Sequence, residues 1–327
     1  MSTGFEQDLK NTHWIEVRAL TPVHVGTDQS KVWLRHIDFD YEKGKIYPID
    51  KEAFLHSLEK SEIQKLSLDV YSKELSDKRK RYRIGQGHDF PSACVNNRFE
   101  SINPQIRDGM GRPYLPGSSI KGAIRAILHA TKNPQRRDDY SFVVSHLLGK
   151  IEQSPMRFLR VSDSYLPKTA IFPAKILSLR KEHEEWVAGW KHDRHGSVVD
   201  LRPDAFMTAF EAFPAGAAGV LRLGLLPDLM NWLNESQQHK IVALKQIQSI
   251  SALFRCINQN IRRRIEAEYK YIEKVSGSLE ECDQLLEAWQ QLKDRLPDEQ
   301  EADRRCILRL GRNVGAHSTT GNWEYPN

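Results

Sequence analysis

The apolar pattern of this 327-residue chain changes near residue 240, and this change constrains the fold more than any other feature. Before it, apolar and polar residues alternate in short runs, as in half-buried strands. After it, apolar residues recur every three or four positions, which predicts a long helix over about 227–275 with a break near 234–238. The stripe consists of Ile241, Leu244, Ile247, Ile250, Phe254, Ile257, Ile261 and Ile265. Strands and helices that do not alternate regularly favour an α+β fold over a doubly wound sheet.

Short strands are expected before this stripe and once after it, where β-branched and aromatic residues gather between turn signals. The expected strands cover residues 14–25, 32–40, 45–49, 157–162, 169–179, 205–213, 220–226 and 304–310. The turn signal Pro214-Ala215-Gly216 predicts that the runs 205–213 and 220–226 pair as a hairpin. Asp50 is expected to cap a helix over about 51–60.

This order of elements divides the chain into three parts. Residues 1–226 form the core, in which the charge-rich stretch 61–86 and the stretch 132–155 are expected to be loop-rich. Residues 227–297 form a helical hairpin, because a capping-box pattern opens a second helix after the stripe. Residues 298–327 supply a terminal strand and a glycine-rich loop that return to the core.

The charge balance is mildly basic. Lys and Arg total 48 against 43 Asp and Glu, a formal net charge of +5, which permits a nucleic-acid partner without requiring one. The four cysteines form no C-x-x-C pair, so we expect reduced thiols, no zinc site and no cofactor. Because no apolar segment matches a signal peptide or a membrane span, we expect a cytoplasmic protein with no membrane partner.

The most informative motif is Pro113–Arg125 (PYLPGSSIKGAIR), in which an apolar run enters a proline-glycine turn before a helix. Ser118 or Ser119 is expected to cap this helix, leaving free N–H groups at its start. Lys121 and Arg125 lie four residues apart and share one helix face. They are either solvated or part of a phosphate-binding site, and the helix start favours the second interpretation.

The two glycines of the motif have two interpretations each. Gly117 and Gly122 either allow the backbone conformation or leave room for the close approach of a ligand. The acidic residues to inspect for metal-assisted chemistry are Asp28, Asp38 and Asp108, and none lies in a paired-carboxylate pattern. Asp108 is expected in a turn, and we assign no metal ligands.

Three strings now have to be taken together: Leu20–Gly26 (LTPVHVG), Tyr114–Arg125 (YLPGSSIKGAIR) and Leu308–Gly315 (LRLGRNVG). Their order and spacing resemble the RAMP superfamily of CRISPR-associated proteins. Within that superfamily they look most like the family of the fifth subunit of type III-A Csm effector complexes. The resemblance implies a modified ferredoxin-like (RRM-type) core with inserted helices.

The resemblance also implies a non-catalytic subunit that binds the CRISPR guide RNA and caps the complex near the 3′ part of that RNA. It implies contact with other Csm-type subunits, above all the neighbouring backbone RAMP subunit. The expected RNA-binding residues are His24, Ser118, Ser119, Lys121, Arg125, Gly311, Arg312 and Gly315.

Two other functions remain open. The chain would be a metal-independent endoribonuclease that processes the guide precursor if His24 acted as the base. It would be a protein-interaction scaffold without RNA affinity if the helical hairpin were the active surface. No second histidine or tyrosine can be placed beside His24 from the sequence, so structural or RNA-stacking roles are favoured for it.

Overall fold

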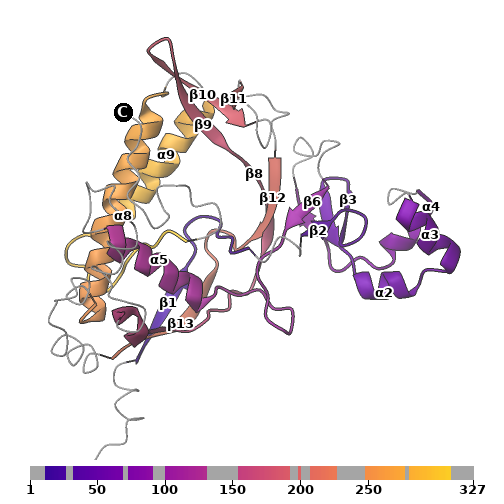
Figure 1. Cartoon of the computed structure of the whole chain (residues 1–327), viewed down its shortest axis with the longest axis horizontal. Coiled ribbons are helices and arrows are strands. Elements are labelled where there is room, and N and C mark those ends of the chain that lie inside the picture. The colour runs from indigo at the N-terminus through magenta and orange to yellow at the C-terminus, as the bar shows by residue number, and fades with distance from the viewer. Residues whose placement is uncertain are drawn as a thin grey trace, which may run out of the picture. The chain divides into compact units, whose positions relative to one another are not determined.

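The computed structural model describes residues 12–26, 32–68, 73–90, 100–130, 154–191, 198–199, 207–226, 247–276 and 280–310 (Figure 1). Within these residues, strands and helices mix without regular alternation, which confirms the α+β prediction. The chain divides into two compact units, each made of segments that are distant in the sequence. The first unit comprises Met1–Thr21, Tyr114–Pro167 and Ala215–Asn327, and the second comprises Pro22–Pro113 and Lys168–Pro214. The three-part division proposed above stays a prediction.

The first unit contains an antiparallel sheet of three strands in the order β1-β13-β7. The strands are β1 (Thr12–Arg18), β13 (Ala218–Leu225) and β7 (Leu159–Val161). Successive side chains of a strand point to opposite faces, so the buried Leu221, Leu223 and Leu225 share one face of β13. Trp14 and Arg222, which lie opposite each other in the register, are exposed on the other face.

Three α-helices and one 3₁₀-helix complete the described part of this unit. They are α5 (Gly117–Ala130), η4 (Pro155–Phe158), α8 (Ile250–Glu273) and α9 (Glu280–Asp294). Helix α5 contacts β7 and α8, and buries an apolar stripe that includes Ile120, Ile124 and Leu128. Helices α8 and α9 pack on each other (Figure 1). An ion pair joins Glu266 of α8 to Lys293 of α9 at 2.9 Å.

Within the described part of the helix expected over 227–275, residues 247–249 are not helical and α8 begins at Ile250. Ser249 has an extended backbone and its side chain accepts a hydrogen bond from the N–H of Ala252, so it is the N-cap of α8. The apolar stripe of α8 itself is confirmed, since Ile257, Ile261 and Ile265 are buried. The stretch 227–246, with the expected break, lies outside the described residues.

The strand expected over 304–310 is wrong, because this segment is irregular in the described structure. The side chain of Asn258 on α8 takes over the hydrogen bonds that a neighbouring strand would have made. Its amide group donates to the carbonyls of Ala302 and Arg305, and its oxygen accepts from the N–H of Ile307. The carbonyl of Arg305 and the N–H of Ile307 thus have hydrogen-bond partners without a neighbouring strand.

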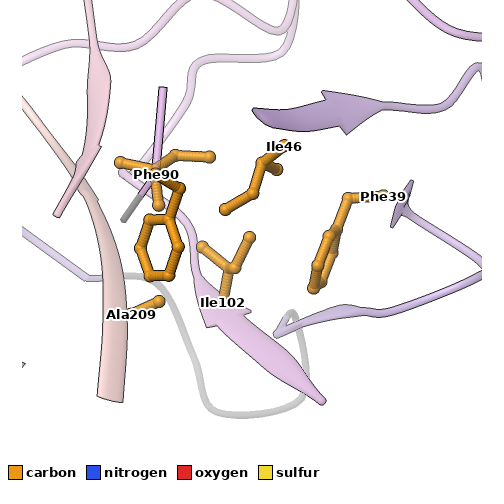
Figure 2. Close-up of a cluster of buried hydrophobic side chains, with 6 residues drawn as sticks. Phe39, Ile46, Phe90, Ile102 and Ala209 are labelled. Atoms are coloured by element: carbon orange, nitrogen blue, oxygen red, sulfur yellow. The ribbon is translucent and has the colours of Figure 1, made fainter. Parts of the chain in front are cut away.

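The second unit contains three sheets among its described residues. The order β2-β6-β12-β8 joins Trp33–Leu34, Ser101–Asn103, Met207–Ala212 and Ala170–Lys175. The order β3-β4-β5 joins Phe39–Glu42, Lys45–Pro48 and His88–Asp89. The order β11-β10-β9 joins Val198–Val199, Glu185–Lys191 and Leu177–Glu182. Figure 2 shows the core of this unit, in which Phe39, Ile46, Phe90, Ile102 and Ala209 gather from both of the first two sheets and from the residue after β5.

The predicted hairpin of 205–213 with 220–226 is wrong. Strand β12 pairs with β8 and, in parallel, with β6, whereas β13 pairs with β1 and β7. The turn after Pro214 is where the chain passes from the second unit to the first, so the two strands enter different sheets. Local turn chemistry predicted the turn correctly but not the partners of the strands.

The described residues of the second unit also form three short helices: α2 (Lys51–His56), α3 (Lys60–Leu68) and α4 (Lys73–Lys80). The Asp50 cap is confirmed by a hydrogen bond from the N–H of Ala53, although α2 ends at His56. The described residues of 61–86 include most of α3 and all of α4, and Leu75 of α4 joins a small core with Ile49, Phe54 and Leu58. Residues 132–153 lie outside the described part of the chain. No helix in the described residues is long and apolar enough to cross a membrane.

Candidate functional site

The start of α5 is capped by an acidic residue from another segment. The helix begins at Gly117, whose N–H donates to the Asp163 carboxylate at 2.8 Å. Ser118 and Ser119 therefore lie in the first turn, and the expectation that one of them is the cap is wrong. The Asp163 carboxylate interacts favourably with the positive end of the helix dipole, as a bound phosphate would have done. Its negative charge disfavours a second anion at the helix start, so we expect phosphate contacts from side chains farther along the helix.

The two glycines of the motif have different surroundings. A Cβ atom on Gly117 would meet the carbonyl oxygen of Val161 and lie 2.8 Å from that of Ser162, so only glycine fits between the helix and the end of β7. Apart from the backbone of α5 itself and the adjacent residues, no atom of the described residues lies within 4 Å of a Cβ built on Gly122, whose position is exposed. The geometric role is thus clear for Gly117, whereas Gly122 leaves open space above α5.

Ser118, Lys121, Gly122 and Arg125 lie on the side of α5 opposite its buried stripe, and we call these four residues the α5 outer face. Lys121 and Arg125 are half-buried, and neither makes an ion pair within the described part of the chain. Burial lowers the pKa of Lys121, because partial desolvation disfavours the charged ammonium form. Two cations one helical turn apart, with no ion-pair partner among the described residues, form a surface suited to an external anion.

The denser basic run, Lys78–Arg83, is arranged differently. Arg83 donates to the carboxylates of Asp40 and Glu42, at 2.5 and 2.6 Å. Its guanidinium also lies 4.3 Å from the centroid of the Tyr47 ring. Both Arg83 and Lys80 lower the pKa of Glu42, chiefly through hydrogen bonds.

Other members of this run are also committed to the fold. Lys78 pairs with Glu62 at 2.6 Å, and Arg79 is 2% exposed. Arg81 alone among the five basic residues of the run is exposed without an ion pair in the described structure. The basic cluster that is most conspicuous in the sequence therefore offers little free positive charge.

His24 lies in the second unit and is surrounded by protein groups. It is 9% exposed, and its Nδ1 atom lies 2.7 Å from the carbonyl oxygen of Glu211. Its ring centroid lies 4.9 Å from that of Phe210. This geometry favours the structural one of its two interpretations, and RNA contact by His24 stays a prediction.

The carboxylate of Glu211, on β12, organises a buried polar network that the sequence analysis missed. It accepts hydrogen bonds from the N–H of Gln105, from Arg107 and from the hydroxyl of Thr169. The Gln105 side chain in turn accepts from the N–H of Val25. The only sequence signal was a single charge within the apolar run Met207–Phe213. The network fixes the ends of several segments beside the LTPVHVG string.

The remaining candidates fall into two groups. Asp108 accepts hydrogen bonds from the N–H groups of Met110 and Arg112, which confirms the predicted turn. Asp38 caps a turn through the N–H of Leu34 and pairs with Lys51. The described residues contain no group of three or more acidic, histidine or cysteine side chains placed to hold a metal. The other candidates, Asp28, Gly311, Arg312 and Gly315, lie outside the described residues.

Comparison with known proteins identifies the family of this chain. The RAMP superfamily model matches residues 16–312, so the chain belongs to the RAMP superfamily. One curated relative, "CRISPR system Cms protein Csm5" of Streptococcus thermophilus, is 29% identical over 140 residues. That match spans 37% of this chain and 38% of the relative, little more than a third of either length.

Two solved structures have a similar fold. One is the crystal structure of T. onnurineus Csm5, with a TM-score of 0.64 and 16% identity over 93% of this chain and 90% of that one. The other is a chain in the cryo-EM structure of a Csm-crRNA-target RNA ternary complex of a type III-A CRISPR-Cas system. Its TM-score is 0.63, with 16% identity over 94% of this chain and 86% of that one. At this identity the likeness establishes a shared fold.

Proposed function

We propose that this chain is a guide-RNA-binding and assembly subunit of a type III-A CRISPR effector complex, equivalent to Csm5 and acting in antiviral defence. Family membership, the partial match to a Csm5 protein and the fold shared with a chain of a Csm complex support this assignment. Its partners are then the CRISPR guide RNA and other Csm-type subunits. Its position is the cap of the complex near the 3′ region of the guide.

The α5 outer face carries this proposal. Lys121 and Arg125 are positive, lie one turn apart and have no ion-pair partner within the described residues. Phosphate contacts of this kind position an RNA strand without reading its sequence, which suits a subunit that must accept many guides. Gly122 leaves room for a backbone to come close between the two cations.

The finer architecture belongs to the same proposal. We assign the described strands and helices to a modified ferredoxin-like RAMP core with inserted helices, and α8 and α9 to a C-terminal helical hairpin. We also keep Gly311, Arg312 and Gly315 as an RNA-contacting loop. The ion pair between Glu266 and Lys293 supports the hairpin, because it joins α8 to the last turn of α9.

We further propose that the subunit is non-catalytic. In the endoribonuclease alternative His24 would act as the base, but its Nδ1 atom is engaged with the Glu211 carbonyl and its ring is buried against Phe210. A base must reach the hydroxyl whose proton it removes, and this position offers little access. Incubation of the purified chain with repeat RNA in EDTA should leave the RNA intact, and cleavage lost on His24→Ala would contradict this part of the proposal.

The experiment that tests the assignment is affinity purification of the full chain from its host cells. The wild-type chain should carry RNA and other subunits. The double variant Lys121→Ala, Arg125→Ala should retain less RNA, because two phosphate contacts are lost. The matched control Lys60→Ala, Arg81→Ala removes two exposed charges from the second unit and should behave like wild type. Retention of subunits without any RNA in the wild-type sample would favour the scaffold alternative instead.

A further inference from the structure

The face of the β1-β13-β7 sheet opposite its buried leucines carries an exposed tryptophan beside an arginine. Trp14 is 71% exposed, and among the described tryptophans it alone is exposed. The register places Trp14 opposite Arg222 and Glu16 opposite Val220. These four residues, together with Arg18, form what we call the Trp14 face.

The charge on this face is only partly neutralised. Arg18 pairs with Glu16 at 2.6 Å. The guanidinium carbon of Arg222 lies 5.7 Å from the centroid of the Trp14 ring. Arg222 makes no ion pair in the described part of the chain. The face thus combines an exposed aromatic ring with a nearby cation that pairs with no carboxylate of the described residues.

The backbone beneath these side chains is well ordered by its hydrogen bonds. All seven residues of β1 are in register with β13, and β13 is the central strand of the sheet. The N–H and carbonyl groups of Arg222 also exchange hydrogen bonds with Ser162, next to β7. The ring and the guanidinium are therefore held on a common rigid surface, which reduces the entropy lost when a ligand binds.

We propose that the Trp14 face is a second RNA-contacting surface, on which an unpaired base stacks on Trp14 while Arg222 contacts the adjacent phosphate. Aromatic rings interleaved with cations are the usual means of holding single-stranded RNA without sequence preference. This inference rests on the proposed function. The α5 outer face would supply phosphate contacts, and the Trp14 face would add a contact with a base.

The composition of the face favours RNA over a protein partner. The cores of protein interfaces are largely apolar and are enriched in aromatic residues and Arg. The Trp14 face has Trp and Arg, but Val220, 52% exposed, is its one aliphatic side chain, and its two arginines outnumber its single carboxylate. A small apolar area with an excess of one positive charge is complementary to a nucleotide.

Photochemical crosslinking tests the contact directly. Full-length chain bound to single-stranded RNA that contains 5-iodouridine should crosslink at Trp14 on irradiation. Trypsin releases this residue in the peptide Asn11–Arg18 (NTHWIEVR), whose only other aromatic ring is that of His13, so mass spectrometry can locate the adduct. Crosslinks elsewhere in the chain, with this peptide unmodified, would overturn the inference.

Binding measurements give an independent test. With a fluorescent oligouridine of about 10 nucleotides, Trp14→Ala should weaken binding about 5- to 150-fold, the range for loss of one stacked base. Trp14→Phe keeps an aromatic face and should recover most of the affinity. Met110→Ala is the matched control, because Met110 is 79% exposed but lies on a turn in the second unit.

The outcomes separate this inference from the function on which it rests. Unchanged RNA affinity in Trp14→Ala, with reduced affinity in Lys121→Ala, Arg125→Ala, would reject the Trp14 contact and leave the proposed function standing. Normal RNA affinity with loss of neighbouring subunits in Trp14→Ala would show a protein contact and overturn the inference. A wild-type chain that binds no RNA, alone or in its complex, would contradict both.

Discussion

The basic run Lys78–Arg83 and the α5 outer face differ in what surrounds their charges. In the basic run, Arg83, Lys78 and Lys80 all pair with carboxylates, and Arg79 is buried. The α5 outer face has only two cations, Lys121 and Arg125, and neither has an ion pair in the described structure. A local count of basic residues therefore does not locate a nucleic-acid surface, because charge that is neutralised within the fold contributes little to an external field.

The same contrast applies to the two glycines of α5. Gly117 is needed by the chain itself, because the end of β7 fills the space where its side chain would be. Gly122 has no such neighbour among the described residues, although glycine within a helix costs about 0.5–1 kcal/mol relative to alanine. An unfavourable helix residue that no described neighbour requires is consistent with the close approach of a partner.

The largest expected effect is on stability and concerns the basic run. Arg83→Ala should lower the free energy of unfolding by about 2–4 kcal/mol, because it leaves Asp40, 6% exposed, without its main counter-charge. Urea titration of the purified chain measures this loss. Arg81→Ala is the control and should change stability by less than about 0.5 kcal/mol. Equal stability of the two variants would show that the charges of the basic run are not committed to the fold.

Substitution of the two glycines should change stability in opposite directions. Gly117→Ala should destabilise the chain by about 1–3 kcal/mol, because its Cβ collides with the backbone of Val161 and Ser162. Gly122→Ala should stabilise it by about 0.5–1 kcal/mol, because alanine is the better helix former and the space is open. Thermal unfolding of both variants checks the signs. If both substitutions destabilised the chain, the outer face of α5 would be covered by other parts of the protein.

The smallest expected effect is a dependence on pH. Burial lowers the pKa of Lys121 below its usual value, so this ammonium loses its proton before ordinary lysines as the pH rises. RNA affinity should fall across that alkaline window. As the pH rises from the lowered pKa of Lys121 in the folded chain to its ordinary pKa in the unfolded chain, the folded state should gain stability. In this window the unfolded state binds more protons than the folded state. The variant Lys121→Arg stays charged in this window and should not show the fall in RNA affinity. If its affinity depended on pH in the same way as that of the wild type, Lys121 would not contact RNA.

Much of the secondary structure followed from local chemistry. The Asp50 cap, the Asp108 turn and the buried stripe of α8 depend on residues a few positions apart, and all three were predicted correctly. The partners of β12 and β13 depend on strands far away in the sequence, and there the prediction failed. A turn signal such as Pro214-Ala215-Gly216 indicates a change of direction but carries no information on which sheet each strand joins.

The candidate site shows the same limit. The spacing of Lys121 and Arg125 predicted their common helix face. The acceptor at the start of α5 is Asp163, which lies 46 positions from Gly117, so the sequence around the helix gave no sign of it. Trp14 and Arg222 meet only through the pairing of β1 with β13. Sequence patterns thus identified the motif, whereas the balance of charge around it required the three-dimensional structure.

The central claim is that the α5 outer face holds RNA phosphates while the basic run does not. The most direct test is the salt dependence of binding of a single-stranded RNA to the full chain. For single strands, log affinity changes with log salt by about 0.7 per phosphate contact. The variant Lys121→Ala, Arg125→Ala should therefore reduce the slope by about 1.4. Lys60→Ala, Arg81→Ala should leave the slope unchanged, and an unchanged slope in the α5 variant would contradict the account.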